Sequence, residues 1–340
     1  MIGDVYLRGI PLALEAGIRS EELKVFGSTI RHVSNGQIAG FLQETSGLSK
    51  IINLVGSGPL APLELIGNGI QIVQGEQIKS GIGRLEEAVA VINQLQIANL
   101  ALSAAGIGVT IAGIAIINHK INGLRREVLA LGDKLDRLLE LTAQDRADRL
   151  EDMIEALRGL AREIDHRWSM SAERAAIGWH RDADEAARLG TFFEGRARRM
   201  LSRQAFAIEE VTPLLDAMVM ATGLRVGALA LSDETSTAIN VARDDARQLE
   251  QITGDIGAAD LVRGRLAEII PVAGDANAGP LIEQEWADAR EVVSSLRSRE
   301  ALATTRAAPL IALNASGASA RDWFAAAREE EDAPVLFMTV

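Results

Sequence analysis

The chain has 340 residues, 48% of them hydrophobic and 4% aromatic, a net charge of −12 and no cysteine. The lack of cysteine excludes disulfide frameworks, thiolate chemistry and most zinc sites, and the acidic balance argues against nucleic acid as a partner, because phosphate binding needs a basic stripe. Few aromatic side chains and many Ala, Leu and Ile residues favour helices over a sandwich or barrel.

The N-terminal region is predicted to combine a helix over residues 5–18 with a β-hairpin over residues 24–45. Asn35-Gly36 lies between two apolar runs of the hairpin segment, and this dipeptide fits a type I′ turn, which needs positive φ at both central residues. A hairpin alone is marginal in water. The segment 333–340 is also strand-like, so both ends of the chain are expected to meet in a small three-stranded element.

The centre of the chain contains a long run without charge. Residues 50–84 are apolar but rich in glycine, and a helix is predicted to begin near Leu85. From Ala88 to Asn118, 31 residues carry no ionisable side chain. Within this run, the 21 residues from Ile97 to Ile117 are enough to cross a bilayer.

Two heptad seams follow the uncharged run. Apolar residues alternate three and four apart, as in a coiled coil. Each seam has two interpretations, an antiparallel partner inside the same bundle or a coiled coil between chains. The first seam is Ile121, Leu124, Val128, Leu131, Leu135 and Leu138, and the second is Leu150, Met153, Leu157, Leu160 and Ile164, continuing to Trp168.

The C-terminal half is predicted to be a helical bundle that acts as a lid, sensor or docking module. Its pattern indicates helices at 172–189, 191–213, 214–231, 235–256, 281–305 and 322–332, with a loop at 271–280. The predicted units are therefore residues 1–49 with the N-terminal helix and hairpin, 50–168 with the membrane-active segment and coiled-coil helices, 169–332 with the bundle, and 333–340 with the last strand.

The sequence offers no pattern for catalysis. The stretch "GSGPLAPLE" has glycines but lacks the lysine and hydroxyl of a phosphate-binding loop. The four histidines, His32, His119, His166 and His180, are too scattered for a metal cage, and there is no nucleophile elbow. We therefore expect no enzyme activity, no cofactor, no metal and no catalytic residue.

The uncharged run has three interpretations: a constitutive membrane anchor, a helix buried permanently in a large bundle, and a helix that is covered in a soluble form and inserts after a trigger. The third is favoured, because small residues recur every four positions and form the close-approach face of membrane helices. The predicted inserting residues are Ile97, Leu100, Leu102, Ile107, Val109, Ile111, Ile114, Ile116 and Ile117. The close-packing residues are Ala101, Ala104, Ala105, Gly108 and Ala112, and the flanking basic residues are Lys120, Arg125 and Arg126.

The stretch "IANLALSAAGIGVTIAGIAII", followed by a coiled-coil helix, resembles the α-helical pore-forming toxins of the cytolysin A type. It is also similar to membrane-perforating effectors of bacterial defence and cell death. The resemblance covers residues 50–165 and lies in the architecture. It implies that Ile97 to Ile117 is the inserting element, that Ile121 to Leu138 belongs to a helical stalk, and that the chains assemble as an oligomeric ring. The missing secretion signal and the N-terminal hairpin depart from that pattern.

The sequence thus predicts a mainly α fold, an elongated or multi-helix bundle with one long apolar helix and a small β element. The predicted function is that of a membrane-active effector or toxin. The alternative is a non-catalytic scaffold or interaction protein whose apolar helix stays buried. Expected partners are a lipid bilayer on activation, further copies of the chain, and a regulatory protein or protease as trigger. The N-terminus lacks a basic leader and a cleavage site, so the protein is expected to be made in the cytoplasm without a secretory signal peptide and to move to a membrane.

Overall fold

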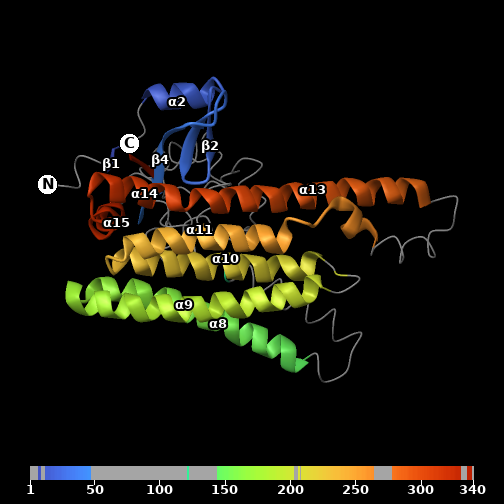
Figure 1. Ribbon diagram of the computed structural model, residues 1–340, viewed down its shortest axis with the longest axis horizontal. Coiled ribbons are helices and arrows are strands. Elements are labelled where there is room, and N and C mark those ends of the chain that lie inside the picture. Colours follow the sequence, from blue (N-terminus) through green and yellow to red (C-terminus); the bar gives the residue numbers. More distant parts are fainter. Residues whose placement is uncertain are drawn as a thin grey trace, which may run out of the picture.

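The fold is mainly α-helical, as predicted, with one small β-sheet (Figure 1). The structure is a computed structural model. It describes residues 7–8, 12–46, 121, 144–202, 206, 208–263, 278–330 and 335–338.

The sheet joins the two ends of the chain. Its five antiparallel strands lie in the order β1-β5-β4-β3-β2, so the last strand lies between the first strand and β4. The predicted meeting of the termini is confirmed, and two strands, β1 and β2, extend the expected three-stranded element. The strands are β1 (Leu7–Arg8), β2 (Leu23–Phe26), β3 (Thr29–His32), β4 (Ile38–Glu44) and β5 (Val335–Met338).

Two turns connect consecutive strands of this sheet, one between β3 and β4 and the other between β2 and β3. The predicted hairpin is confirmed as β3 and β4, but its turn is not the expected type I′, because Gly36 has positive φ, at 71°, and Asn35 does not. The side-chain oxygen of Asn35 instead accepts a hydrogen bond from the Gln37 amide at 2.9 Å. Gly27 at φ 60° allows the second turn, between β2 and β3. Positive φ is cheap for glycine and costly for most other residues, so these positions fix where the strands reverse.

A short helix covers the sheet. Helix α2 (Leu12–Arg19) lies over it in Figure 1, and Leu14 and Ile18 pack on a small core that belongs to the sheet. The predicted helix over residues 5–18 is therefore wrong at its start. Residues 7–8 form β1 instead, because pairing with the distant strand β5 outweighs the local helical spacing. The core of the sheet consists of Leu23, Val25, Ile30, Leu42 and Phe337.

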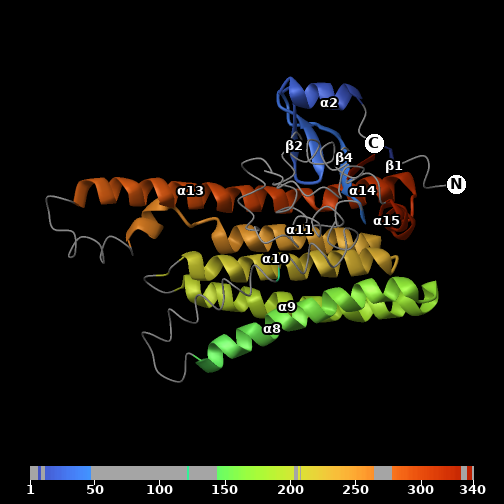
Figure 2. The same ribbon diagram turned by 180° about the vertical axis from the view of Figure 1, so that it is seen from behind.

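The helices stack in layers beneath the sheet. In both views the helices lie in the order α13 and α14, α11, α10, α9 and α8 from top to bottom, which is the reverse of their order along the chain (Figures 1 and 2). The helices are α8 (Gln144–His166), the short 3-10 helix η2 (Arg167–Ser169), α9 (Ala172–Leu201), α10 (Ile208–Leu231), α11 (Thr235–Thr253), α13 (Ala278–Thr305), α14 (Ala307–Ser316) and α15 (Ala320–Glu329).

Two helix boundaries differ from the sequence prediction. Residues 172–201 form one continuous helix, α9, because its buried stripe passes over Gly190 from Leu189 to Phe193, and this packing outweighs the helix penalty of a glycine. Pro213 does not end a helix but lies inside α10, in its second turn, so the packing of this buried helix outweighs the loss of one intrahelical hydrogen bond. Helices α11, α13 and α15 appear where they were predicted, within a few residues.

The second heptad seam faces the interior of the chain's own bundle. Leu157, Leu160 and Ile164 of the seam are almost fully buried in a core shared with α9, α10 and the C-terminal helices. Leu150, Met153 and Trp168 are partly buried against this core, and Ile154, which the predicted seam did not include, is almost fully buried in it. This seam therefore has its partners within the chain. Phe41 of β4 belongs to the same core, so the sheet and the bundle are packed together.

Candidate functional site

The predicted membrane-active residues lie almost entirely outside the described part of the chain. This holds for the segment Ile97 to Ile117 with its close-packing face, for the basic residues Lys120, Arg125 and Arg126, and for the seam from Leu124 to Leu138. Ile121 is described. It is helical, has no exposed surface and belongs to the main bundle core.

A different apolar helix lies at the centre of the described bundle. Within α10, the 22 residues Glu210–Leu231 are long and apolar enough to cross a membrane, yet 78% of their most apolar stretch is buried inside the bundle. In the part of the chain that the structure describes, α10 alone meets this criterion. One such helix is weak evidence of a span, because a core helix of a soluble protein meets the criterion as well. The predicted helix over residues 214–231 corresponds to this segment, but its capacity to span a membrane was not predicted. Its composition carried the signal, since hydrophobic residues occur on all of its faces.

Arginine side chains from the C-terminal helices are connected to α10 at three positions along its length, two of them directly and one through Asp245 of α11. Near the start of α10, Asp216 forms an ion pair with Arg299 of α13, with 2.9 Å between the carboxylate oxygen and the guanidinium nitrogen. Both side chains are partly buried, so this pair is less screened by water than a surface pair.

The second contact is a buried cluster at the middle of α10. Asp245 of α11 accepts a hydrogen bond from the Thr222 hydroxyl of α10 at 2.6 Å, and one from Arg306, which directly precedes α14, at 2.5 Å. The side chains of Asp245 and Arg306 are each only 5% exposed. The cluster therefore connects three helices through one desolvated ion pair.

The third contact caps the C-terminal end of α10. Arg321 of α15 donates two hydrogen bonds to the Leu231 carbonyl, at 3.0 and 2.8 Å, and lies 3.2 Å from the carboxylate of Asp233. Its guanidinium also lies 5.5 Å from the ring centre of Trp179 in α9. The last carbonyls of a helix lack intrahelical donors and carry negative partial charge, so a cation stabilises them.

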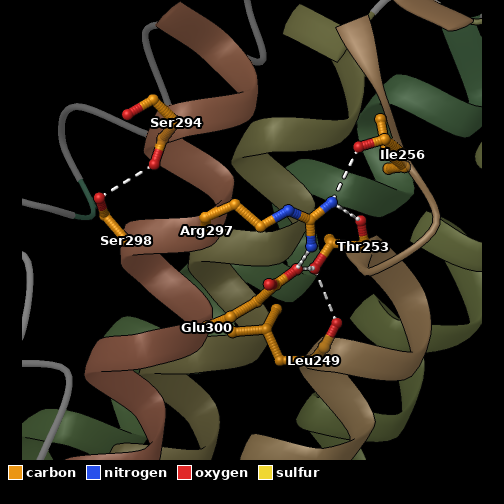
Figure 3. A network of polar contacts seen from close by, with 7 residues as sticks. All are labelled: Leu249, Thr253, Ile256, Ser294, Arg297, Ser298 and Glu300. Atoms are coloured by element: carbon orange, nitrogen blue, oxygen red, sulfur yellow. Dashed lines mark hydrogen bonds and ion pairs between the residues drawn. The ribbon is translucent and has the colours of Figure 1, made fainter. Parts of the chain in front are cut away.

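An arginine of α13 caps α11 in the same way (Figure 3). Arg297 donates to the carbonyls of Thr253 and Ile256, each at 2.8 Å, and pairs with Glu300 one turn further on. The Thr253 hydroxyl is shared between Glu300, at 2.5 Å, and the Leu249 carbonyl, at 2.8 Å. This network fastens the middle of α13 to the end of α11.

Further charged contacts connect α8 to its neighbours. Arg167 of η2 forms a two-pronged hydrogen bond with Asp182 of α9, at 2.5 and 2.8 Å, which raises the pKa of Arg167. Arg328 of α15 pairs with Asp165 of α8 at 2.5 Å.

The ion pairs and hydrogen bonds described above connect helices of the bundle to one another. Among the described residues, no group of three or more His, Asp or Glu side chains is arranged to hold a metal ion. What the geometry can do is keep an apolar helix of membrane-spanning length inside a bundle with a charged exterior. We name the contacts of Arg299, Arg306 and Arg321 the arginine clamp.

No known protein family, curated protein or solved structure matches this chain.

The Asp245 carboxylate is expected to make stability depend on pH. Burial raises its pKa above the usual 3.8, and the Arg306 guanidinium and the Thr222 hydroxyl only partly oppose this effect. Since the folded-state pKa is the higher one, the resulting contribution to stability is complete below about pH 3.9 and is lost as the pH rises through the folded-state pKa. The Asp245→Asn variant cannot titrate at this position.

The difference in unfolding free energy between wild type and Asp245→Asn should therefore decrease with rising pH. Urea denaturation of both proteins at a series of pH values measures it, and effects of the other carboxylates cancel in the difference. Glu194 is the further acidic group that raises the pKa of Asp245, and its effect is the smallest of those that act on it. Glu194→Gln is therefore the control, whose difference in unfolding free energy from wild type should change less with pH than that of Asp245→Asn. A difference that stays constant or grows with pH would contradict the assignment.

Proposed function

We propose that the protein is a membrane-active helical effector or toxin that inserts a conditionally exposed apolar helix and forms a pore or depolarises a membrane. The observation that carries this proposal is the uncharged run from Ala88 to Asn118, in which Ile97 to Ile117 is long enough to span a bilayer. In a chain with 24% charged residues, such a run has few uses besides membrane insertion and deep burial.

The described bundle supports the conditional part of this proposal. Helix α10 has the length and composition of a membrane span, and the chain keeps it covered with amphipathic helices and the arginine clamp. On this proposal, neighbouring helices cover the segment Ile97 to Ile117 in the same way until a trigger releases it. On this proposal, the protein is made in the cytoplasm, a regulatory protein or a protease releases the segment, and further copies join it at the membrane.

Dye release from liposomes tests the proposal directly. Purified full-length protein is added to vesicles with neutral or anionic lipids, before and after limited proteolysis. We expect release after the restraint is cut, because the exposed apolar segment then partitions into the bilayer. Intact vesicles under all conditions would contradict the membrane function.

The lysines offer a second test of insertion. The chain has five lysines, Lys24, Lys50, Lys79, Lys120 and Lys134. If the glycine-rich segment and Ile97 to Ile117 enter as a hairpin, Lys79 crosses the bilayer. A membrane-impermeant amine reagent coupled to a polymer too large for a dye-releasing pore should then label Lys79 less when vesicles are present, with unchanged labelling of the other four lysines. Equal labelling of Lys79 with and without vesicles would exclude the hairpin.

Substitution of Gly108 by arginine is expected to abolish dye release and to preserve the soluble fold. A charge at the centre of a bilayer costs about 2.5–3.5 kcal/mol on insertion scales, so the segment is less able to enter the membrane. Dye release and thermal unfolding are measured for Gly108→Arg and for Gly108→Ala, a matched control that keeps the segment apolar. Release by the arginine variant at the wild-type rate would contradict the assignment of Ile97 to Ile117 as the inserting element.

The alternative function is that of a non-catalytic helical scaffold whose apolar helix is buried permanently. It is favoured by α10, which meets the criterion for a membrane span and is a core helix in this structure. For a scaffold, Gly108→Arg would place an unpaired charge in a core and unfold the protein, at a cost of several kcal/mol. The thermal unfolding of this variant therefore separates the two functions.

A further inference from the structure

The last strand of the chain fills a central position in the sheet. Strand β5 pairs with β1 on one side, with Leu7 opposite Met338, and with β4 on the other, with Glu44 opposite Val335. Among the described strands, β1 pairs with β5 alone. Without β5, the sheet would separate into β1 and the group β2 to β4, and β4 would present an open edge.

The position of β5 is specific for its side chains. Phe337 is 3% exposed and packs on Leu42 and Ile30 in the small core of the sheet. Its ring lies directly over Gly40, so that a methyl group at Gly40 would overlap with the ring atoms Cε2 and Cζ. The sheet thus has a slot, lined by Gly40 and these apolar residues, that accepts a strand with an aromatic residue at this register.

The connection between β5 and the bundle is short and strongly acidic. Helix α15 ends at Glu329 and β5 begins at Val335. In the sequence, residues 329–332 are four consecutive acidic residues, and Pro334 directly precedes the strand. Like charges repel one another, and a short connection before a terminal strand is a common place for the exchange of that strand between copies.

We propose that β5 is an exchangeable strand and that the slot between β1 and β4 accepts the C-terminal strand of a second copy of this chain. The second copy fits by construction, because its strand carries the same residues in the same register as the one that fills the slot now. Exchange of an identical terminal element needs no new interface and is a low-cost route to an oligomer. The proposal stands apart from the membrane function, to which it would supply a route of assembly.

The short connection restricts the geometry of exchange. Six Cα steps separate Glu329 from Val335, which span at most about 20 Å when extended. The slot that receives β5 must therefore lie close to the end of α15 of the donor. The two copies are expected to associate through their sheets, with the far ends of both bundles apart.

The absence of native cysteine allows a direct test by cross-linking between chains. One variant carries Glu44→Cys and another Val335→Cys, two positions that face each other in the β4 and β5 register. The two variants are mixed, unfolded together, refolded at high concentration and mildly oxidised. We expect a disulfide-linked dimer with one chain of each kind. The double variant Glu44→Cys/Val335→Cys shows that the pair can link within one chain, and Ser298→Cys, exposed on α13, replaces Val335→Cys to measure random collisions.

The outcomes separate this inference from the membrane function. A linked dimer above the Ser298→Cys background supports strand exchange, whereas linkage only within the double variant overturns it. Dye release by the same samples after limited proteolysis is scored independently, so leakage without linkage overturns the exchange alone, and linkage without leakage overturns the membrane function alone.

A second measurement uses the unmodified chain. Light scattering after refolding at high concentration should show a dimer, and an excess of the peptide APVLFMTV, residues 333–340, should suppress it by filling the slot. A monomer at every concentration, or a dimer that the peptide leaves unchanged, would overturn the proposal.

Discussion

Replacement of Asp245 by alanine is expected to lower the free energy of unfolding by about 3–5 kcal/mol. The substitution removes the acceptor of both the Arg306 guanidinium, whose side chain is only 5% exposed, and the Thr222 hydroxyl, whereas the carboxyl of Asp245 offers an acceptor in either protonation state. An unpaired buried charge cannot recover its lost hydration, so the cost exceeds the net value of the pair. Urea denaturation followed by tryptophan fluorescence measures the change.

Removal of both charges should restore most of the loss. The double variant Asp245→Leu/Arg306→Met replaces the ion pair by apolar side chains, which in other proteins is neutral or stabilising by about 1–4 kcal/mol. Asp244→Ala is the matched control, because Asp244 is adjacent on the same helix and pairs with Arg247 at the exposed surface. A loss in Asp244→Ala as large as that in Asp245→Ala, or a double variant as unstable as the single one, would contradict a desolvated pair at this position.

Local signals were sufficient for several elements of the fold. Asn35-Gly36 predicted the position of the turn between β3 and β4, since glycine adopts positive φ at little cost, although Gly36 alone of the pair does so. The three-and-four spacing of α8 predicted its buried face, since helical periodicity needs no knowledge of the partner. The C-terminal strand was recognised from its run of apolar residues, and the lack of other strand-like segments indicated its partner.

Long-range contacts explain what the sequence did not predict. Strand β1 has only two residues and exists through its pairing with β5, more than 320 residues away in the chain. Arg306 and Asp245 are 61 residues apart, and nothing in the neighbourhood of either residue indicates that they meet. The arginine clamp was missed for this reason, because each of its contacts joins helices that are distant in sequence.

The apolar helix α10 and the apolar segment Ile97 to Ile117 illustrate why the candidate site is harder to predict than the fold. Hydropathy and length are properties of a segment, and by both measures α10 and the segment Ile97 to Ile117 are similar. Burial is a property of the whole fold, and it assigns α10 to a core. Burial therefore separates a core helix from a membrane span where hydropathy and length do not, and the contacts of the arginine clamp belong to the buried state of α10.

Replacement of Phe337 by alanine is expected to destabilise the sheet by about 3–5 kcal/mol. The ring is 3% exposed and fills the space over Gly40, and the loss of its burial is increased by the cavity that it leaves. Because the sheet has its own small core, the effect should concentrate there, and hydrogen exchange of the β3 and β4 amides should accelerate more than that of α10. Val33→Ala is the control, since Val33 lies at the hairpin tip and is 61% exposed.

The close approach of Gly40 and Phe337 allows a compensation experiment. Gly40→Ala alone should destabilise the sheet, because the added methyl group overlaps with the Phe337 ring at Cε2 and Cζ. Leucine lacks both of these atoms, so the double variant Gly40→Ala/Phe337→Leu should be more stable than the sum of the two single changes predicts. A double-mutant cycle followed by hydrogen exchange measures this coupling. Additive effects would mean that the ring does not occupy the space over Gly40, and the specificity of the slot for its own C-terminal strand would then have to come from the backbone pairing alone.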